Sequence, residues 1–417
     1  MKNIWQSLEY IKEQSKNKTI VFWGRSEDWV HKTIKELSGI SIEAIVDINE
    51  VYHNTSFYDI PVISPSKLNE IEDDIFIVIT GGTYESIIDS ISDMNYKKGT
   101  EYCCSPVFKD WAILHDMRDY EQNLLIVSSD HTEKEGGKRY SRLGGGLFTF
   151  NTSTNKLEKK VDGHFRQIVE VDNLYYVVEY EEKLVYVIDK EYNILHKYKI
   201  DQSEKQNEKP NSCGIAYHPK KEQFYIANAG SDVINIYKKQ DFQYVDSIHI
   251  SQKSTQKGGG LHHINDLTIA DDSLFVTCFS ITGVWKNDFM DGGIFEYDVN
   301  NIQKSPNVLI NTLWKPHSIE YINNKICYLD SMRGNLHIGN QVVAGYFQGF
   351  ARALAYDNRF YYVGQSEAMY LKELFHINSN TILNSGIYMF DATNKVSRFY
   401  TFPELSNVHD ILVINND

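Results

Sequence analysis

Residues 264–279 read INDLTIADDSLFVTCF, in which two short apolar runs flank the polar pair Asp271 and Asp272. Each run has the length and composition of a β-strand, and an acidic pair between two such runs is typical of a turn. One hairpin decides little about a fold. The same pattern repeated at a regular spacing indicates a repeat architecture, which must be recognised before any motif is interpreted.

The pattern recurs. A polar or small pair, an apolar strand, a turn at Asn, Asp or Lys and a returning strand are also found at 165–180, 212–230, 316–331, 351–366 and 408–417. The last copy stops after one strand, and its missing partners are NLLIVSS, GGGLFTFN and KLEKKV, between residues 123 and 161. Pairing the end of this region with its beginning removes an exposed sheet edge. The sequence therefore predicts a six-bladed β-propeller over residues 120–417, with four strands in each blade.

Composition agrees with a mainly β protein and restricts its partners. The 417 residues include 28 Tyr and 20 Phe, which favour strands. The net charge of −14 argues against nucleic acid or an anionic membrane as a partner, because both bind basic surfaces. No segment has the apolar length of a signal peptide or a membrane span. The five cysteines show neither zinc spacing nor a disulfide framework, so we expect reduced thiols and a cytoplasmic location.

Residues 1–115 have a different pattern, in which strands alternate with helices. We expect helices over 1–16, 26–39 and 83–99, and strands over 18–24, 42–47, 60–64 and 74–80. This alternation predicts a small α/β domain with a parallel, doubly wound, Rossmann-like sheet. Gly24 and Asp47 follow the first two strands, where such a domain holds the pyrophosphate and ribose of a nucleotide. The turn reads GRSEDW and lacks the second and third glycines of G-x-G-x-x-G, so nucleotide binding is doubtful and a tight turn is the simpler interpretation.

Both regions resemble known bacterial proteins. The α/β segment resembles truncated nucleotide-binding-like domains attached to sugar-modifying and surface-polysaccharide proteins. The runs HHINDLTI, KPHSIEYINNKICYLDSMRG and GFARALAYDNRFYYVGQS are similar to a poorly characterised family of bacterial six-bladed propellers. That resemblance implies a propeller and a link to sugar and surface-polysaccharide gene contexts. A more distant similarity, to propeller lactonases and peptide-amide lyases, implies a metal at the channel mouth.

Aligning the copies predicts which side chains meet at the channel. Inner strands line the central channel of a propeller, and their starts gather at one end. The first aligned column is Arg166, Cys213, Asn265, His317, Arg352 and His409, and the second is Gln167, Gly214, Asp266, Ser318, Ala353 and Asp410. His263 precedes Asn265 by two positions, so strand alternation keeps it on the same side. Each histidine alone is more often structural, and we assign that role to His164, His218 and His262.

The first column as a set predicts chemistry. Neutral imidazoles from different strands suit a transition metal, which His263, His317 and His409 would hold. Paired arginines form a clamp for a carboxylate or phosphate, and clustered cations are costly unless an anion neutralises them. We therefore assign catalytic roles to His317, His409, Arg352 and Arg166, and a substrate-binding role to Asn265.

A second ring is predicted at the ends of the second strands. Glu179 and Asp330 are its carboxylates and are candidates for general bases or for partners of a histidine or arginine, although a turn cap or salt bridge is equally expected. Asn228 and Gln365 of this ring are substrate-binding candidates. Long insertions at 130–146, 280–293 and 366–386 should gather over one face, where Arg142 could reach an anion. Trp285, Phe289, Met290, Tyr370 and Phe375 would supply an apolar wall or pack among the loops.

Two functions fit this pattern. The first is an enzyme acting on a sugar, a sugar nucleotide or a similar small anion at the channel mouth, by isomerase, epimerase, lyase or lactonase chemistry, with or without a divalent metal. The second is a non-catalytic glycan- or protein-binding scaffold tethered by the α/β domain. No P-loop, nucleophile elbow or H-E-x-x-H motif supports another enzyme class. The convergent His and Arg column favours the enzyme.

Overall fold

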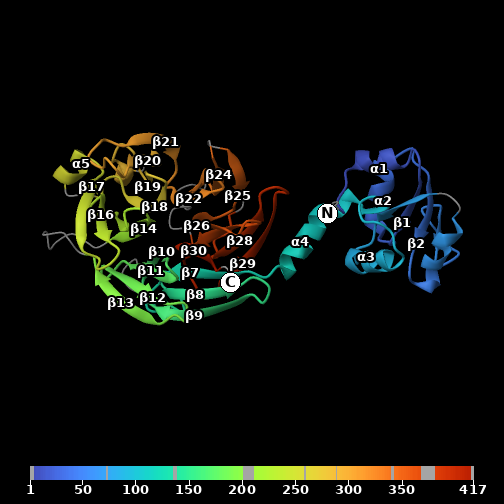
Figure 1. Cartoon of the computed structure of the whole chain (residues 1–417), viewed down its shortest axis with the longest axis horizontal. Helices are drawn as coiled ribbons and strands as arrows, with labels where there is room; N and C mark the ends of the chain where they lie inside the picture. The colour runs from blue at the N-terminus through green and yellow to red at the C-terminus, as the bar shows by residue number, and fades with distance from the viewer. Residues whose placement is uncertain are drawn as a thin grey trace. The chain divides into compact units, whose positions relative to one another are not determined.

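A computed structural model describes residues 4–71, 74–134, 139–200, 211–257, 260–287, 289–339, 342–367 and 381–414. The chain divides into two compact units, Met1–Asp116 and Met117–Asp417 (Figure 1). Tyr370 and Phe375 lie outside the described residues. Over the ranges given above, no helix has the length and apolar character needed to cross a membrane.

The first unit contains a mainly parallel sheet with the strand order β3-β4-β2-β1-β5-β6. The pairs β1–β2, β1–β5, β2–β4 and β5–β6 are parallel, and β3–β4 is an antiparallel hairpin. Its elements are α1 (Leu8–Gln14), β1 (Thr19–Trp23), α2 (Glu27–Glu36), β2 (Ile42–Val46), η1 (Glu50–Tyr52), β3 (Ser56–Phe57), β4 (Ile60–Ile63), η2 (Pro65–Glu70), β5 (Ile75–Ile79), α3 (Tyr84–Asp93), β6 (Tyr102–Cys104), η3 (Pro106–Phe108) and α4 (Lys109–Asp119), the last of which continues into the second unit.

Helices cover both faces of this sheet because successive side chains of a strand point to opposite sides. Val21 and Trp23 of β1 pack in one apolar cluster with residues of α3, whereas Ile20 and Phe22 pack in another with residues of α1 and α2. The first helix is shorter than expected. It begins at Leu8, because the hydroxyl of Ser7 accepts the N–H of the helix's third residue and caps it.

The second unit is a six-bladed β-propeller of four-stranded antiparallel sheets, as predicted. The first blade consists of β10 (Phe165–Val171), β11 (Leu174–Glu179), β12 (Leu184–Ile188) and β13 (Ile194–Lys199). The second consists of β14 (Ser212–His218), β15 (Gln223–Asn228), β16 (Val233–Lys238) and β17 (Tyr244–His249), and is followed by α5 (Gln252–Lys257). The third consists of β18 (Ile264–Ala270), β19 (Ser273–Cys278), β20 (Gly292–Asp298) and β21 (Asn307–Leu313), with η4 (Trp285–Asn287) between β19 and β20.

The next two blades are β22 (His317–Ile322), β23 (Lys325–Asp330), β24 (Asn335–Ile338) and β25 (Val343–Tyr346), and β26 (Phe350–Tyr356), β27 (Tyr361–Ser366), β28 (Gly386–Asp391) and β29 (Val396–Thr401). The closing blade combines both ends of the propeller region: β30 (Asp410–Ile414), β7 (Asn123–Ser128), β8 (Gly146–Asn151) and β9 (Lys156–Asp162).

Closure of the ring follows the predicted pairing. β30 runs antiparallel to β7, with Asp410 opposite Val127 and Ile414 opposite Asn123, and the red C-terminal strand lies beside the teal one in Figure 1. The side-chain amide of Gln122 also donates to the backbone oxygen of Ile414, at 2.8 Å. The inner strand of the closing blade is therefore paired along its length, and the ring has no free edge there.

The apolar core of the propeller lies between neighbouring blades. Tyr225 and Ile234 of one blade, for example, pack in one cluster with Leu267 and Val276 of the next. Because apolar side chains fill the spaces between blades, the inner strands can present polar side chains to the central channel without loss of the core.

Each inner strand from β10 to β26 has a register shift close to its start. The shifts fall between Phe165 and Ile168, Ser212 and Ile215, Ile264 and Leu267, His317 and Ile319, and Ala351 and Ala353. These irregularities coincide with the two predicted columns. A bulge redirects side chains and leaves backbone groups outside the ladder, so this backbone feature aims the columns into the channel.

Side chains of the second column bond to backbone groups of the neighbouring inner strand. Gln167 accepts the N–H of Ile215 at 2.6 Å. Asp266 accepts the N–H of Ser318 at 2.8 Å, and Asp410 accepts that of Ile168 at 3.1 Å. Buried N–H groups need such acceptors, and these bonds join adjacent blades around the channel.

Candidate functional site

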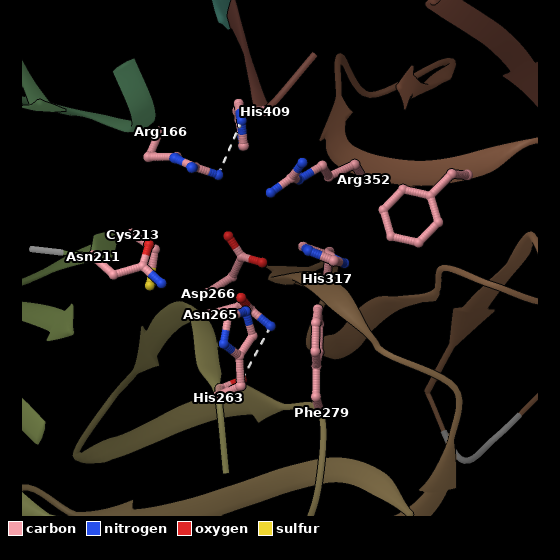
Figure 2. Close-up of a pocket in the computed structure, with 11 residues that line it drawn as sticks. Arg166, Asn211, Cys213, His263, Asn265, Asp266, Phe279, His317, Arg352 and His409 are labelled. Atoms are coloured by element: carbon pink, nitrogen blue, oxygen red, sulfur yellow. Dashed lines mark hydrogen bonds between the residues drawn. The ribbon is translucent and has the colours of Figure 1, made fainter. Parts of the chain in front are cut away.

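A cavity of about 150 Å³ lies where the inner strands begin, and we call it the channel-mouth cavity. All six blades contribute to it or to its rim. Its lining consists of Arg166, Asn211, Cys213, His263, Asn265, Asp266, Phe279, His317, Phe350, Arg352 and His409 (Figure 2). The whole first column and His263 are thus brought together. Asp266, Asn211, Phe279 and Phe350 were not assigned to the site, although Asp266 stands in the second aligned column.

Arg166 and Arg352 enter the cavity from different blades. In Figure 2 both guanidinium groups point toward the central space that the Asp266 carboxylate also faces. Arg166 packs on the ring of Tyr180, with 4.1 Å from Cζ to the ring centroid, and its buried Nε has no hydrogen-bond partner among the described residues. Stacking fixes the guanidinium plane, so its donors are preorganised for an anion.

His409 is held as a neutral imidazole. Its Nε2 lies 3.1 Å from Nη1 of Arg166 and 2.7 Å from Oγ of Ser129. A guanidinium can only donate, so Nε2 is the acceptor and the proton of the ring is on Nδ1. His409 is 5% exposed, which makes this assignment part of a buried polar network.

His317 is oriented by the backbone oxygen of Lys315, by the hydroxyl of Ser331, which lies 3.0 Å from Nδ1, and by two aromatic rings. Its Nδ1 donates toward the backbone oxygen of Lys315, at 3.1 Å. Phe279 and Phe350 contact the imidazole edge-on, with ring centroids at 5.2 and 5.3 Å. The proton on Nδ1 leaves a lone pair on Nε2, which is the atom suited to accept a proton from a ligand.

His263 belongs to a loop that Asp232 anchors from the preceding blade. The buried Asp232 carboxylate accepts the backbone N–H of His263 at 2.8 Å and that of His262 at 2.9 Å. The His263 ring then packs against Phe279 and Trp285, at 4.4 and 4.6 Å. His262 is buried and does not line the cavity.

Burial and the two arginines keep all three cavity histidines neutral. Burial, followed by the charges of Arg166 and Arg352, lowers the pKa of His263 to about 3. The pKa values of His317 and His409 are also well below the usual range, mainly through burial and then through Arg352. A neutral imidazole near neutral pH is a base, so the cavity combines two fixed cations with three bases.

Asp266 has the opposite shift. Burial raises its pKa to about 6, while the Ser318 N–H and the two arginines oppose that change. The carboxyls of Asp410 and Glu320, further along the channel, have pKa values well above the usual range, mainly because of burial; the charge of Asp266 adds to both shifts and that of Asp410 to the shift of Glu320. Asp266 therefore exchanges a proton near neutral pH, beside histidines that do not carry one, and this separation is characteristic of acid–base sites.

The two second-ring carboxylates lie outside the cavity. Glu179 accepts the backbone N–H groups of His164 and Glu182, and Asp330 accepts that of Trp314, at 2.8 Å. Neither lines the channel-mouth cavity. Their oxygens satisfy turns at the blade ends, so the structure places them in the turn-capping role that was the alternative for each.

The other residues that were predicted to bind substrate, apart from Asn265, form contacts outside the cavity. Asn228 accepts a backbone N–H two residues further along, and Gln365 donates to backbone oxygens of the insertion after β27. Arg142 is largely exposed and pairs with Glu404, at 3.2 Å. The insertions at 130–146 and 366–386 do meet, since Arg139 donates to the backbone oxygen of Glu367.

The cavity histidines are not arranged as a metal site. His263, His317 and His409 do not bring three ligand atoms within 4.8 Å of one another; in the described ranges His131, His164 and Glu181 alone do so. The Nε2 atom of His409 already accepts from Ser129 and Arg166, and two guanidinium charges oppose a cation. A metal on these three residues therefore stays a prediction that the geometry of the described residues does not support.

Gly24 and Asp47 line a separate cavity of about 650 Å³ in the α/β unit, at the carboxyl ends of β1, β2 and β5. A Cβ on Gly24 would lie 2.5 Å from Gly81, so the glycine allows two strand ends to approach closely. Arg25 occupies the next position and stacks on Tyr52, with 3.6 Å from Cζ to the ring centroid. Ser26 and Trp29 stand where the fingerprint has its second and third glycines.

Comparison with known proteins finds no family for the chain and only distant structural similarity. No protein-family model and no curated protein matches the chain. Among solved structures, the nidogen/laminin complex is 10% identical with a TM-score of 0.48, over 70% of this chain and 98% of that one. A protein of unknown function from Bacteroides caccae is 11% identical with a TM-score of 0.47, over 71% and 100%. A luciferin-regenerating enzyme is 12% identical with a TM-score of 0.39, over 60% and 76%.

Proposed function

We propose that the chain is an enzyme that binds a small anionic sugar derivative in the channel-mouth cavity and transfers protons on it. The observation that carries the proposal is the convergence of Arg166 and Arg352 on a cavity that also holds Asp266. Two cations in a partly buried cavity are costly unless an anion neutralises them. A planar carboxylate or a phosphate fits a pair of guanidinium groups.

The size of the cavity limits the range of ligands that fit it. A cavity of about 150 Å³ is close to the volume that holds a single benzene ring. One sugar ring or a short hydroxy acid therefore suits it better than a whole nucleotide sugar, of which only the terminal group would enter. The rings of Phe279 and Phe350 supply an apolar wall for the carbon skeleton.

The acid and base follow from the protonation states. His317 removes a proton from the carbon next to the bound carboxylate, and the arginines stabilise the negative charge that develops. The protonated carboxyl of Asp266 returns a proton to the substrate. Return to the opposite face of the same carbon gives an epimer, whereas protonation of a leaving oxygen gives elimination.

A binding module without chemistry is the second candidate. One observation favours it: Asp266 also accepts the Ser318 N–H, a contact that joins two blades. In that case the cavity would hold an anionic glycan end, and the carboxyl of Asp266 would serve the fold. The two functions differ in whether Asp266 is needed for turnover.

The setting of the reaction is proposed from the sequence. Resemblance to surface-polysaccharide proteins and five cysteines that are all free thiols support a role in bacterial polysaccharide synthesis in the cytoplasm. We also propose that the α/β unit is Rossmann-like without being a dinucleotide-binding domain, because the turn after β1 lacks the fingerprint glycines.

A ligand screen tests the proposal on the full-length protein. Uronates, sugar phosphates and short hydroxy acids should raise the melting temperature, and the corresponding neutral sugars should not. Arg352→Lys should weaken binding nearly as much as Arg352→Ala, because a point charge cannot reproduce the bidentate fork. The exposed Arg359→Lys is the matched control. Unchanged anion binding in Arg352→Ala would contradict the proposal.

Asp266→Asn separates the enzyme from the binding module. With a substrate found in the screen, this variant should lower kcat by about 10²- to 10⁴-fold and leave the dissociation constant nearly unchanged. Anion binding by the wild-type protein without any turnover would support the binding module.

A further inference from the structure

A second cluster of chemically active side chains lies at the joint between the closing blade and the blade that begins with β10. His131 follows β7, His164 lies in the turn between β9 and β10, and Glu181 lies in the turn between β11 and β12. One ligand atom from each lies within 4.8 Å of the other two. Three segments far apart in the sequence thus bring two imidazoles and a carboxylate to one point.

The ring of His164 is oriented as that of a metal ligand. Its Nδ1 donates to the backbone oxygen of Asp130, at 3.1 Å, so Nε2 carries the lone pair. That Nε2 lies 3.8 Å from Oε2 of Glu181, and Nε2 of His131 lies 3.2 Å from Oε1. A metal ion between them would be bound by both the lone pair and the carboxylate. A backbone acceptor on the other ring nitrogen is what metal-binding histidines usually have.

Two further contacts hold the ligands in place. Glu179 accepts the backbone N–H groups of His164 and of Glu182, so one buried carboxylate fixes both turns. The hydroxyl of Tyr180 donates to Oε1 of Glu181, at 3.1 Å. Supporting contacts of this kind are typical of sites that hold a metal in a defined geometry.

A cavity of about 280 Å³ adjoins the two histidines and is also lined by Glu133 and Asp162. It shares no lining residue with the channel-mouth cavity. The space allows water or a further oxygen ligand to complete the coordination. Two imidazoles and one carboxylate with an open position form a donor set that Zn²⁺ and other divalent transition metals accept.

We propose that His131, His164 and Glu181 bind one divalent transition-metal ion, with its open position directed to this cavity. The ion links the closing blade to the next blade at the place where the ring is completed. This assignment is independent of the anion site, which it neither needs nor excludes. It also gives His164, for which the sequence indicated only a structural role, a function as a ligand.

Zinc titration of the chelator-treated full-length protein tests the site. We expect one equivalent of Zn²⁺ by elemental analysis and calorimetry, and Co²⁺ should give absorption bands of a coordination number below six. His164→Ala and Glu181→Gln should each lower Zn²⁺ affinity by about 100-fold or more, since loss of a supporting residue alone costs ten- to a hundredfold. Because Glu181→Gln keeps the size of the side chain, this variant should keep the wild-type fold. Circular dichroism will verify the fold.

Matched controls separate this site from other histidines. His196→Ala, on the exposed face of β13, and His317→Ala, in the channel-mouth cavity, should keep one equivalent of Zn²⁺. The proposal is overturned if the wild-type protein takes up no stoichiometric Zn²⁺, or if His317→Ala loses it while a folded Glu181→Gln variant retains it. Failure of anion binding would leave this result unaffected.

Discussion

Three residues at or next to the channel-mouth cavity have an unusual backbone conformation. His263, Lys315 and Ser318 have φ angles of 52°, 48° and 45°, in the left-handed region that non-glycine residues rarely adopt. Each costs about 1 kcal/mol or more, so surrounding contacts must hold it. Asp232 does so for His263 by accepting its N–H.

The protonation of His263 predicts a pH dependence of stability. Its pKa is lowered to about 3 in the folded protein, mainly by burial and then by Arg166, so the neutral form is favoured on folding. The resulting stability is complete above the usual histidine pKa near 6.5 and is lost as pH falls toward 3. His263→Asn tolerates the left-handed backbone and cannot titrate.

We therefore compare the free energy of unfolding of the wild type with that of His263→Asn. The difference, wild type minus variant, should fall by up to about 1.4 kcal/mol per pH unit below pH 6.5. Urea melts between pH 4.5 and 8 measure this difference, with His196→Asn as the control on exposed strand β13. A difference that is constant with pH would show that His263 is not held neutral by the fold.

At the scale of the element, the bulge at the start of each inner strand from β10 to β26 determines which side chains reach the channel. It turns the first column into the cavity and leaves N–H groups that the second column satisfies from the neighbouring blade. Where neighbouring inner strands approach each other closely, the second column consequently contains small residues. At Gly214 a Cβ would lie 2.4 Å from the backbone oxygen of Asn265.

Gly214→Ala should therefore separate β14 from β18 and strain the contact between Gln167 and Ile215. We expect a loss of about 1–3 kcal/mol in the free energy of unfolding, as for other overpacked positions. The reverse exchange at the equivalent position, Ala353→Gly, should cost about 0.5–1 kcal/mol by backbone entropy. Denaturant melts compare the two, and equal losses would contradict the role given to the close approach at Gly214.

At the scale of the whole molecule, the ring depends on the strand that completes it. β30 supplies the inner strand of the closing blade, including Asp410, whose carboxylate bonds to Ile168 of the next blade. Its removal would expose the edge of β7 and leave that backbone N–H without its acceptor. The channel-mouth cavity would lose His409 at the same time.

Truncation after Phe402 should thus abolish the cooperative unfolding transition of the propeller and promote aggregation. Deletion of residues 415–417, which follow the last residue of β30, is the control and should leave the transition in place. Calorimetry and light scattering distinguish the outcomes. A truncated protein that melts like the full-length one would be incompatible with ring closure through β30.

The other unit makes a separate prediction about nucleotides. Its cavity lies at the carboxyl ends of parallel strands, but the glycines that admit a pyrophosphate are missing and Arg25 stands beside it. The full-length protein should therefore show no saturable NAD binding at micromolar concentration by calorimetry. Saturable binding that Arg25→Ala abolishes would mean that the arginine replaces the glycines as the phosphate contact.

Repetition made most of this architecture predictable. The propeller, its closing pair of strands and the column from Arg166 to His409 all follow from aligning copies of one pattern, because strand periodicity is a local property of the chain. A repeated register also implies that equivalent residues meet at one axis. The alternation of strands and helices before residue 115 predicted the parallel sheet for the same reason.

The remaining features required the folded chain. Bulges do not alter composition, so the alignment could not tell that Asp266 would face the cavity while Glu179 would cap two turns. His131 and Glu181 lie in turns outside the repeat, where no periodicity relates them to His164. The pKa shifts depend on burial and on which charges meet. Only the tertiary structure decides these, since each arises from contacts between segments that are distant in sequence.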